Sequence, residues 1–317
     1  MITTNINKAK KALVNEEIVS IPTETVYGLA GNAYSENALK KIFILKNRPF
    51  YNPLIVHIKS IEFIHNVATD VPEMALKLAH NFWPGPLTLV LKKQKHIPDI
   101  VTGGKDTVAI RMPNHPITLA LLEMLEFPLA APSANPFGAI SPTSAEHVNN
   151  YFTDKLEIII DGGECAKGLE STIIGFENNQ PVLYRHGAVS VEAIEECIGK
   201  VFVKTNDDEK PQAPGMLSRH YAPITDTYLT NNVNELLKSF EGRKIGLLLF
   251  NKKTMNKKNI IQEVLSTNGN LNEAGKNLYA ALHRLDKLKL DVIIAEKFPN
   301  EGLGKTINDR LERAIKK

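Results

Sequence analysis

Short apolar runs alternate with amphipathic stretches along much of the chain, and this alternation is the strongest limit on its fold. Residues 35–45 and 73–82 carry apolar residues at helical spacing, whereas residues 87–91 and 107–112 have the length and composition of strands. Helices and strands that alternate in this way indicate an α/β domain. Open α/β sheets bind ligands where their strands end, so we expect functional residues there.

The same patterns predict elements further along the chain. Predicted strands are 17–21, 53–58, 157–160, 173–176, 182–184, 245–250 and 291–295, and predicted helices are 61–68, 117–125, 191–198, 271–285 and 307–315. A helix also starts near Ser141, with Thr143 and Glu146 as a capping box. The polar segment 92–106 is predicted to be a loop, and Trp83 to be a core residue.

The chain is predicted to contain two α/β domains with a polar segment between them. Residues 204–214 are charged, contain proline and lack apolar periodicity, which indicates a linker. We therefore predict a larger domain over 1–203, a linker over 204–224 and a smaller domain over 225–317. A length of 317 residues allows each domain to bury its own core.

Composition excludes several classes of protein. The net charge of +3 is too small to argue for nucleic-acid binding by itself. Cys165 and Cys197 have no CxxC or zinc-ligand spacing, and their number is typical of reduced thiols in a cytosolic protein. The N-terminus lacks an apolar core of the secretory type, and no apolar run has membrane-spanning length. We predict a cytoplasmic protein without a membrane segment.

Residues 46–58 combine a basic pair, two prolines and a short apolar strand. Lys46 and Arg48 end an amphipathic helix, and Pro49 and Pro53 stiffen the loop that leads to His57. Taken alone, such a pair is most often a solvated helix end. Held on a rigid turn between buried elements, it would instead form a site for a polyphosphate or a carboxylate.

Other nucleotide and hydrolase motifs are not complete in this sequence. Gly302 to Thr306 ends like a P-loop, but Pro299 occupies the position where the motif needs its first glycine. A capped helix start is the better interpretation of this segment. The sequence contains no GxGxxG, HExxH or GxSxG pattern, which argues against a dinucleotide site, a zinc hydrolase and an α/β-hydrolase.

The first domain carries scattered cations, hydroxyls and amides, each of which taken singly is more often structural. They are Thr25, Lys46, Arg48, Asn52, His57, Arg111, Ser133, Asn135, Ser141, Ser171 and Arg185. Few carboxylates accompany them, so a two-carboxylate hydrolase or a carboxylate metal cage is not indicated. The set suits an anionic substrate with a phosphate-based leaving group.

Lys46-x-Arg48, followed far downstream by Ser133-x-Asn135, resembles the YrdC-type threonylcarbamoyl-AMP synthases. Further blocks that are similar to that family lie at 22–29, 83–88, 131–135 and 168–172. Residues 214–216 and 220–223 are similar to the linker of its longer, two-domain form. The resemblance covers nearly the whole chain.

The resemblance implies a fold and an activity. The fold is a YrdC-like twisted mixed sheet with flanking helices, followed by a smaller Rossmann-like α/β domain. The activity is that of a nucleotidyltransferase, which condenses L-threonine, bicarbonate and ATP to threonylcarbamoyl-AMP and pyrophosphate. The product would pass to the transferase machinery that makes threonylcarbamoyl-adenosine in tRNA; direct tRNA contact is allowed but not required. Mg²⁺ is expected to bind through the ATP phosphates, with no metal ligand from the protein.

The resemblance also implies roles for individual residues. Threonine would contact Thr25, His57, Arg111, Ala131 and Ser171. ATP would contact Arg48, Asn52, Thr107, Ser133, Ser141, Arg185 and Tyr221. Catalysis would involve Lys46, Arg48, Ser133 and Asn135. Tyr221 would make the linker a lid that excludes water.

Two other functions remain open from the sequence. One is an RNA-binding module that uses a concave basic face of the same fold without synthase activity. The other is a carbamoyl transferase that uses carbamoyl phosphate and needs no bicarbonate.

Overall fold

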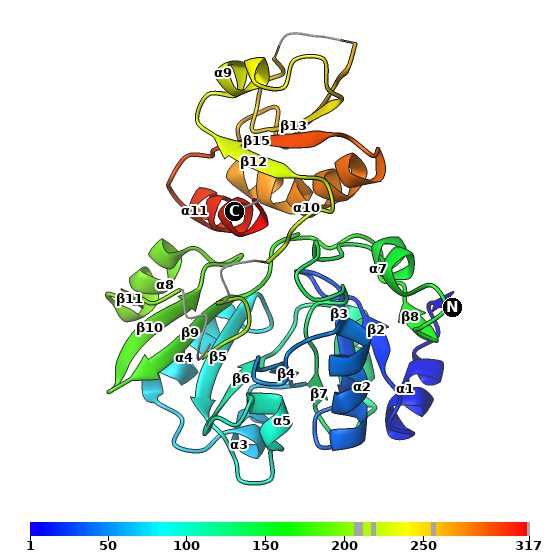
Figure 1. Cartoon of the computed structure of the whole chain (residues 1–317). Coiled ribbons are helices and arrows are strands. Elements are labelled where there is room, and N and C mark those ends of the chain that lie inside the picture. The colour runs from blue at the N-terminus through cyan, green and yellow to red at the C-terminus, as the bar shows by residue number, and fades with distance from the viewer. Residues whose placement is uncertain (206–211, 217–219, 255–257, 316–317) are drawn as a thin grey trace.

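The computed structural model describes residues 1–205, 212–216, 220–254 and 258–315, which form a larger and a smaller α/β unit (Figure 1). The predicted linker lies partly outside the described residues, at 206–211 and 217–219. The smaller unit contacts one side of the larger one through helices α10 (Leu271–Lys287) and α11 (Leu303–Ala314). Along the described residues, no helix has both the length and the hydropathy needed to cross a membrane.

The larger unit is built on one mixed sheet of eleven strands in the order β1-β8-β2-β3-β7-β4-β6-β5-β9-β10-β11. The strands are β1 (Ile2–Thr3), β2 (Val19–Ile21), β3 (Gly28–Asn32), β4 (Ile55–His57), β5 (Leu87–Lys92), β6 (Thr107–Arg111), β7 (Leu129–Ala130), β8 (Ile158–Ile160), β9 (Thr172–Glu177), β10 (Gln180–Arg185) and β11 (Phe202–Val203). β4 is parallel to β6 and antiparallel to β7, so His57 and Arg111 are paired at the same end of the sheet.

Helices cover this sheet and complete its core. They are α1 (Ile6–Val14), α2 (Glu36–Lys46), α3 (Ile64–Val67), α4 (Glu73–Phe82), α5 (Asp99–Thr102), α6 (Pro116–Glu123), α7 (Ala145–Phe152) and α8 (Val191–Ile198). The largest cluster of buried apolar residues joins α2, α4 and α8 to the central strands. A smaller cluster lies on the sheet beside the linker, where Ala213 and Met216 pack against Ile55 and Ala109.

The smaller unit has a four-stranded parallel sheet in the order β12-β15-β13-β14. Its elements are β12 (Thr227–Thr230), α9 (Val233–Lys238), β13 (Ile245–Leu249), β14 (Ile260–Val264), α10, β15 (Val292–Glu296) and α11. α10 and α11 lie on the face of this sheet toward the larger unit, and α9 lies on the far side (Figure 1). This arrangement is the predicted Rossmann-like type.

Close approach at the domain junction depends on a glycine. Gly168 has a φ of +67°, and a Cβ atom at this position would collide with the backbone of Lys276 in α10. The next residue, Leu169, packs against Gly275 of α10 and belongs to the core cluster of the smaller unit. The loop 168–171 of the larger unit is therefore seated directly on α10.

Most predicted elements are present, and several details differ. The helices 73–82 and 191–198 have the predicted bounds, and Trp83 is buried as expected. The capping box is wrong: Ser144, not Thr143, caps α7 by accepting from the amide of His147. The segment 92–106 contains the short helix α5, and β3 was not predicted because its glycines and alanine lack strand propensity.

One further expectation needs correction. Gly302 to Thr306 does begin a helix, α11, but no side chain caps its start. β11, which pairs in parallel with β10, was not predicted. β12, α9 and β14 of the smaller unit were also not predicted.

Candidate active site

A narrow cavity of about 50 Å³ lies where the strand ends of the larger unit meet the linker. Nine of the predicted site residues line its wall: Thr25, Arg48, His57, Arg111, Ala131, Ser133, Ser171, Arg185 and Tyr221. These residues come from distant parts of the sequence, and the sheet brings them together because their strands end at the same edge.

Lys46 supports this wall from behind. α2 ends at Lys46, and Asn47 adopts a left-handed conformation with a φ of 51° that turns the chain toward Arg48. The buried ammonium of Lys46 donates to the carbonyl oxygen of Ser133 at 2.6 Å and also to that of Asn135. Burial and the nearby Arg48 lower the pKa of Lys46 well below its usual value.

Arg48 is buried and held only by neutral groups. It donates to the carbonyl and side-chain oxygens of Asn52, at 3.2 and 2.7 Å, and to the carbonyl of Pro53 at 2.7 Å. Burial and the charge of Arg185 lower the pKa of Arg48 to about 9, so the group remains cationic at neutral pH. The loop with two prolines fixes these acceptors, which explains why Arg48 can be held in place without a carboxylate.

Arg185 has a similar environment at the end of β10. It donates to the carbonyl of Ser171 at 2.9 and 3.1 Å, to the hydroxyl of Ser171 at 3.0 Å and to the carbonyl of Pro214 at 3.2 Å. The linker passes closely over it at Gly215, which has a φ of +86°, and a Cβ atom there would lie 2.7 Å from Arg185 Cδ. The linker is thus attached to the charged wall of the cavity.

Arg111 differs because it has a carboxylate partner. Its Nη2 lies 2.7 Å from Glu24 Oε2 as a buried ion pair without hydrogen-bond geometry, and its Nε donates to the carbonyl of Gly85 at 3.2 Å. Burial and Arg111 lower the pKa of the adjacent His57 to about 3, so its imidazole is neutral at physiological pH. Glu24 was not among the predicted site residues, although it lies inside the block 22–29.

Five predicted residues do not line the cavity itself. Lys46, Asn52 and Asn135 lie one layer behind the wall, and the hydroxyl of Ser141 donates to Glu170 at 2.6 Å. Thr107 lies at the start of β6, opposite Lys92 and four residues before Arg111.

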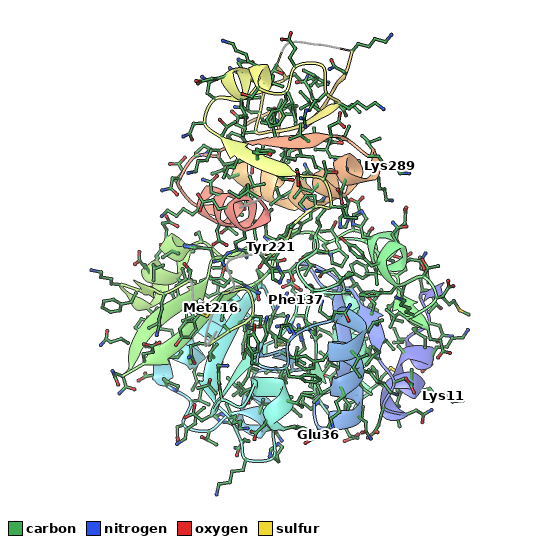
Figure 2. All side chains as sticks on the ribbon, viewed as in Figure 1. Lys11, Glu36, Phe137, Met216, Tyr221 and Lys289 are labelled. Carbon is green, nitrogen blue, oxygen red and sulfur yellow. The ribbon has the colours of Figure 1, made fainter. Side chains whose placement is uncertain are left out.

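His220 and Tyr221 of the linker line the cavity. Figure 2 shows Tyr221 between the larger and the smaller unit. Tyr221 is buried with a φ of 64°, and its ring lies 4.7 Å from the guanidinium carbon of Arg310 and 5.8 Å from the ring of Tyr279. The ring of His220 meets Phe137 edge-on at 5.9 Å. These contacts show that the described part of the linker is packed into the site.

Several buried polar atoms at the site have no hydrogen-bond partner among the described residues. They are Asn52 Nδ2, Asn135 Oδ1, His220 Nδ1 and the hydroxyl of Tyr221. Unpaired buried polar atoms are unfavourable and are usual where a ligand supplies the partner. Of these residues, His220 and Tyr221 line the cavity, whereas Asn52 and Asn135 lie behind its wall. The unpaired atoms of His220 and Tyr221 are therefore consistent with a polar ligand in the cavity.

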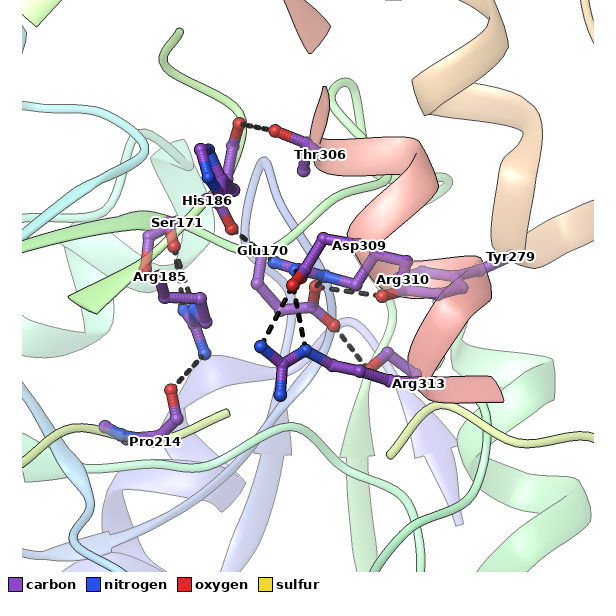
Figure 3. Close-up of polar contacts among 12 residues, drawn as sticks. Glu170, Ser171, Arg185, His186, Pro214, Tyr279, Thr306, Asp309, Arg310 and Arg313 are labelled. Atoms are coloured by element: carbon purple, nitrogen blue, oxygen red, sulfur yellow. Dashed lines mark hydrogen bonds and ion pairs between the residues drawn. The ribbon is translucent and has the colours of Figure 1, made fainter. Parts of the chain in front are cut away.

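Glu170 is the second acidic residue that sequence reasoning missed. It lines the cavity and accepts a hydrogen bond from Ser141. It also accepts hydrogen bonds from Tyr279 and Arg310 (Figure 3). Tyr279 and Arg310 belong to the smaller unit, more than 100 residues away in sequence, so no local pattern could identify the contact.

The site offers no protein cage for a metal ion. Within the described residues, no group of three His, Cys, Asp or Glu side chains is placed to hold one. Glu170 is the only carboxylate among the described cavity-lining residues, and both of its oxygens are engaged.

The sequence matches known families over both units. Residues 11–187 match the Sua5–YciO–YrdC family, described as telomere recombination, and residues 189–315 match the family described as threonylcarbamoyl-AMP synthase, C-terminal domain. A threonylcarbamoyl-AMP synthase of Pyrococcus abyssi is 45% identical over an alignment of 314 positions, which includes 94% of this chain and 90% of the relative.

Two more comparisons agree with these matches. A threonylcarbamoyl-AMP synthase of Bacillus subtilis is 40% identical over an alignment of 319 positions, which includes 98% of this chain and 92% of the relative. A crystal structure of P. abyssi Sua5 complexed with L-threonine aligns with a TM-score of 0.90 at 42% identity, covering 98% of this chain and 95% of that one. The chain therefore belongs to the threonylcarbamoyl-AMP synthase family in its two-domain form, and it is an enzyme of the nucleotidyltransferase type.

Proposed function

We propose that the cavity condenses L-threonine, bicarbonate and ATP to threonylcarbamoyl-AMP and pyrophosphate. The observation that carries this proposal is that Arg48, Arg111, Ser133 and Arg185 line one cavity. In the reaction, the threonine amine and bicarbonate form a carbamate with loss of water, and a carbamate oxygen attacks the α-phosphorus of ATP as pyrophosphate leaves. Two anions must meet, so fixed cations are needed to offset their repulsion.

The threonine subsite would lie at the paired ends of β4 and β6. Arg111 is the group suited to clamp the carboxylate, because a guanidinium matches carboxylate geometry. Thr25, His57, the backbone of Ala131 and Ser171 would complete the subsite, with His57 as a neutral hydrogen-bonding partner.

The ATP subsite would use the cations held by neutral groups. Arg48 and Arg185 keep their positive charge uncancelled by a direct carboxylate partner, which suits a polyphosphate. Ser133, Ser141, Asn52, Thr107 and Tyr221 would contribute polar contacts, and Lys46 and Asn135 would support the wall. Mg²⁺ would enter with the ATP phosphates and shield their charge, because Glu170 has no free oxygen for it.

The linker would act as a lid. A volume of about 50 Å³ is well below the roughly 300–1,000 Å³ of pockets that hold small-molecule ligands. Both substrates need more room, so we expect the segment that carries Tyr221 to move outward before ATP binds. Closure over the product would protect a labile mixed anhydride from water.

We expect the product to be passed to a transferase that modifies tRNA, and we expect a cytoplasmic location. Both cysteines are free, with Cys165 buried, which is consistent with a reducing compartment. Neither expectation affects the chemistry of the cavity.

The test is an assay of pyrophosphate release without RNA. Release that requires ATP, threonine and bicarbonate together supports the proposal, and omission of each substrate in turn is the control. Salt-dependent RNA binding without any turnover would instead identify an RNA-binding module. Turnover that uses carbamoyl phosphate and needs no bicarbonate would identify a carbamoyl transferase.

A further inference from the structure

A buried ion pair connects the smaller unit to the wall of the cavity. Glu170 Oε2 accepts from Arg310 Nε at 2.8 Å and from the hydroxyl of Tyr279 at 2.9 Å (Figure 3). Its Oε1 accepts from the hydroxyl of Ser141. The side chains of Arg310 and Glu170 are 1% and 7% exposed. The pair is therefore shielded from solvent. In the protein interior its charges act more strongly on neighbouring groups than they would in water.

Arg310 reaches three parts of the site from a single position on α11. It pairs with Glu170, which precedes Ser171 in the chain. It donates to the carbonyl of His186 at 2.6 Å, next to Arg185. Its guanidinium also lies over the ring of Tyr221, at 4.7 Å. One side chain of the smaller unit thus contacts a cavity residue, or the neighbour of one, on three separate segments.

The charge of Glu170 creates a difficulty for an anionic substrate. Burial would raise its pKa, but Arg310, Arg185 and the hydroxyl of Ser141 outweigh that effect and lower the pKa to about 2. Glu170 is therefore ionised at neutral pH and lines the same cavity as Arg48 and Arg185. An uncompensated carboxylate at this place would repel a polyphosphate and draw on the positive charge of Arg185.

We propose that Arg310 is a positioning residue for the reaction: it cancels the charge of Glu170 beside the polyphosphate and holds the loop 168–171 in place. This inference rests on the proposed function, because it assumes that ATP occupies the cavity. It gives the smaller unit a direct part in substrate binding. Catalytic contacts remain with the larger unit, since Arg310 acts through Glu170 and Tyr221.

The test compares three variants of the full-length enzyme, using KM for ATP from pyrophosphate release and thermal midpoints. Arg310→Gln leaves Glu170 uncompensated and should raise KM for ATP at least ten-fold, about 1.4 kcal/mol. Glu170→Gln removes the carboxylate charge and should lower KM for ATP. The double variant should return KM for ATP to within about three-fold of the native value, because neither charge remains.

This pattern separates charge cancellation from a purely structural role. If the pair only held the domains together, Glu170→Gln would raise KM or lower kcat just as Arg310→Gln does, because each single change leaves a buried partner unpaired. That result would overturn the proposal. If Arg310→Gln does not fold, the sign of the Glu170→Gln effect decides, since a higher KM for ATP would contradict charge cancellation.

The matched control is Arg284→Gln. Arg284 belongs to α10 of the same unit and makes a two-bond pair with Glu263, at 2.8 Å for each bond, with 56% of its side chain exposed. Its loss should leave KM for ATP unchanged. The Kd for ATP, measured directly on the native protein and the variants, tests the role of Arg310 without relying on turnover. The proposed function has its own criterion: it fails only if the native enzyme releases no threonine-dependent pyrophosphate.

Discussion

Two groups of buried cations in this molecule have different partners. In the cavity wall and directly behind it, Arg48, Arg185 and Lys46 donate to carbonyl oxygens, an amide oxygen and a hydroxyl. At the domain junction, Arg310 and Arg313 face the carboxylates of Glu170 and Asp309. A carbonyl orients a cation without cancelling its charge, whereas a carboxylate does both. The first group is therefore suited to bind an anion. In the second group, the Arg310–Glu170 pair joins the two units, and the Arg313–Asp309 pair lies within α11.

The two groups of cations also differ in the electrostatic free energy of the unliganded protein. Buried charges without a counter-charge are unfavourable, and the lowered pKa of Lys46 reflects burial and the repulsion from Arg48. Binding of a polyphosphate would relieve this repulsion, so part of the binding energy is stored in the free protein. The junction stores no comparable repulsion, because its cations are already neutralised.

The largest effect should come from a cation held by neutral groups. Arg48→Ala should reduce pyrophosphate release by about 10²–10³-fold or more, because fixed cations stabilise the transition state. The thermal midpoint should stay close to the native value, since an uncompensated buried charge is removed. The control is Arg243→Ala, an exposed arginine of the smaller unit that lies over Phe240. Normal turnover of the Arg48 variant would contradict the division into two groups.

Acid should destabilise both regions through buried histidines. Burial lowers the pKa of His57, His220 and His283 to about 3, below the usual 6.5. Between these values the unfolded chain binds more protons than the folded one, so stability falls as pH falls from 6.5. Each histidine should cost about 2 kcal/mol at pH 5.

Urea unfolding at pH 7, 6 and 5 measures this dependence. His283 lies at the junction, stacks on His147 at 3.9 Å and meets the carbonyl of Ser141 at 3.1 Å. His283→Asn should flatten the stability profile between pH 6.5 and 5. An unchanged profile in this variant would show that His283 does not contribute to the acid sensitivity.

Arg111 is the intermediate case, with one carboxylate and one carbonyl partner. Arg111→Lys keeps the charge but cannot serve both partners and a bidentate substrate carboxylate. The Kd for threonine should rise about ten-fold, measured by calorimetry without ATP, while ATP binding should change little. An equal loss of affinity for both ligands would place Arg111 with the polyphosphate cations instead.

The smallest effect should come from an exposed pair at the same junction. Lys305 of α11 contacts Glu192 of α8 at 2.6 Å, with side chains 34% and 51% exposed. Lys305→Ala should change the free energy of unfolding by less than about 1 kcal/mol, because solvent screens such pairs. Urea denaturation measures this value, and a loss as large as that in Arg310→Gln would mean that burial does not distinguish the two pairs.

Local signals predicted much of the fold and of the cavity. The spacing of apolar residues predicted helices such as 73–82. The residues that meet at the cavity lie at the predicted ends of strands. β3 was missed because Gly28 and Gly31 favour turns when considered alone, and its strand form comes from pairing with β2 and β7. Tertiary pairing decides such segments, and periodicity does not report it.

The acidic residues of the site could not be predicted for a related reason. Glu24 and Glu170 lie in blocks that the resemblance had already marked, but their partners, Arg111 and Arg310, are 87 and 140 residues away. Ion pairs over such separations leave no periodic trace. Their role follows only from the folded arrangement.

The seat of Gly168 on α10 has a consequence for evolution and for engineering. Any larger residue at position 168 would force the two units apart, because the backbone of Lys276 leaves no room for a Cβ atom. The halves should therefore evolve as a matched set, and chimaeras that graft one relative's C-terminal half onto another's N-terminal half should succeed only when both surfaces of this joint are transplanted together.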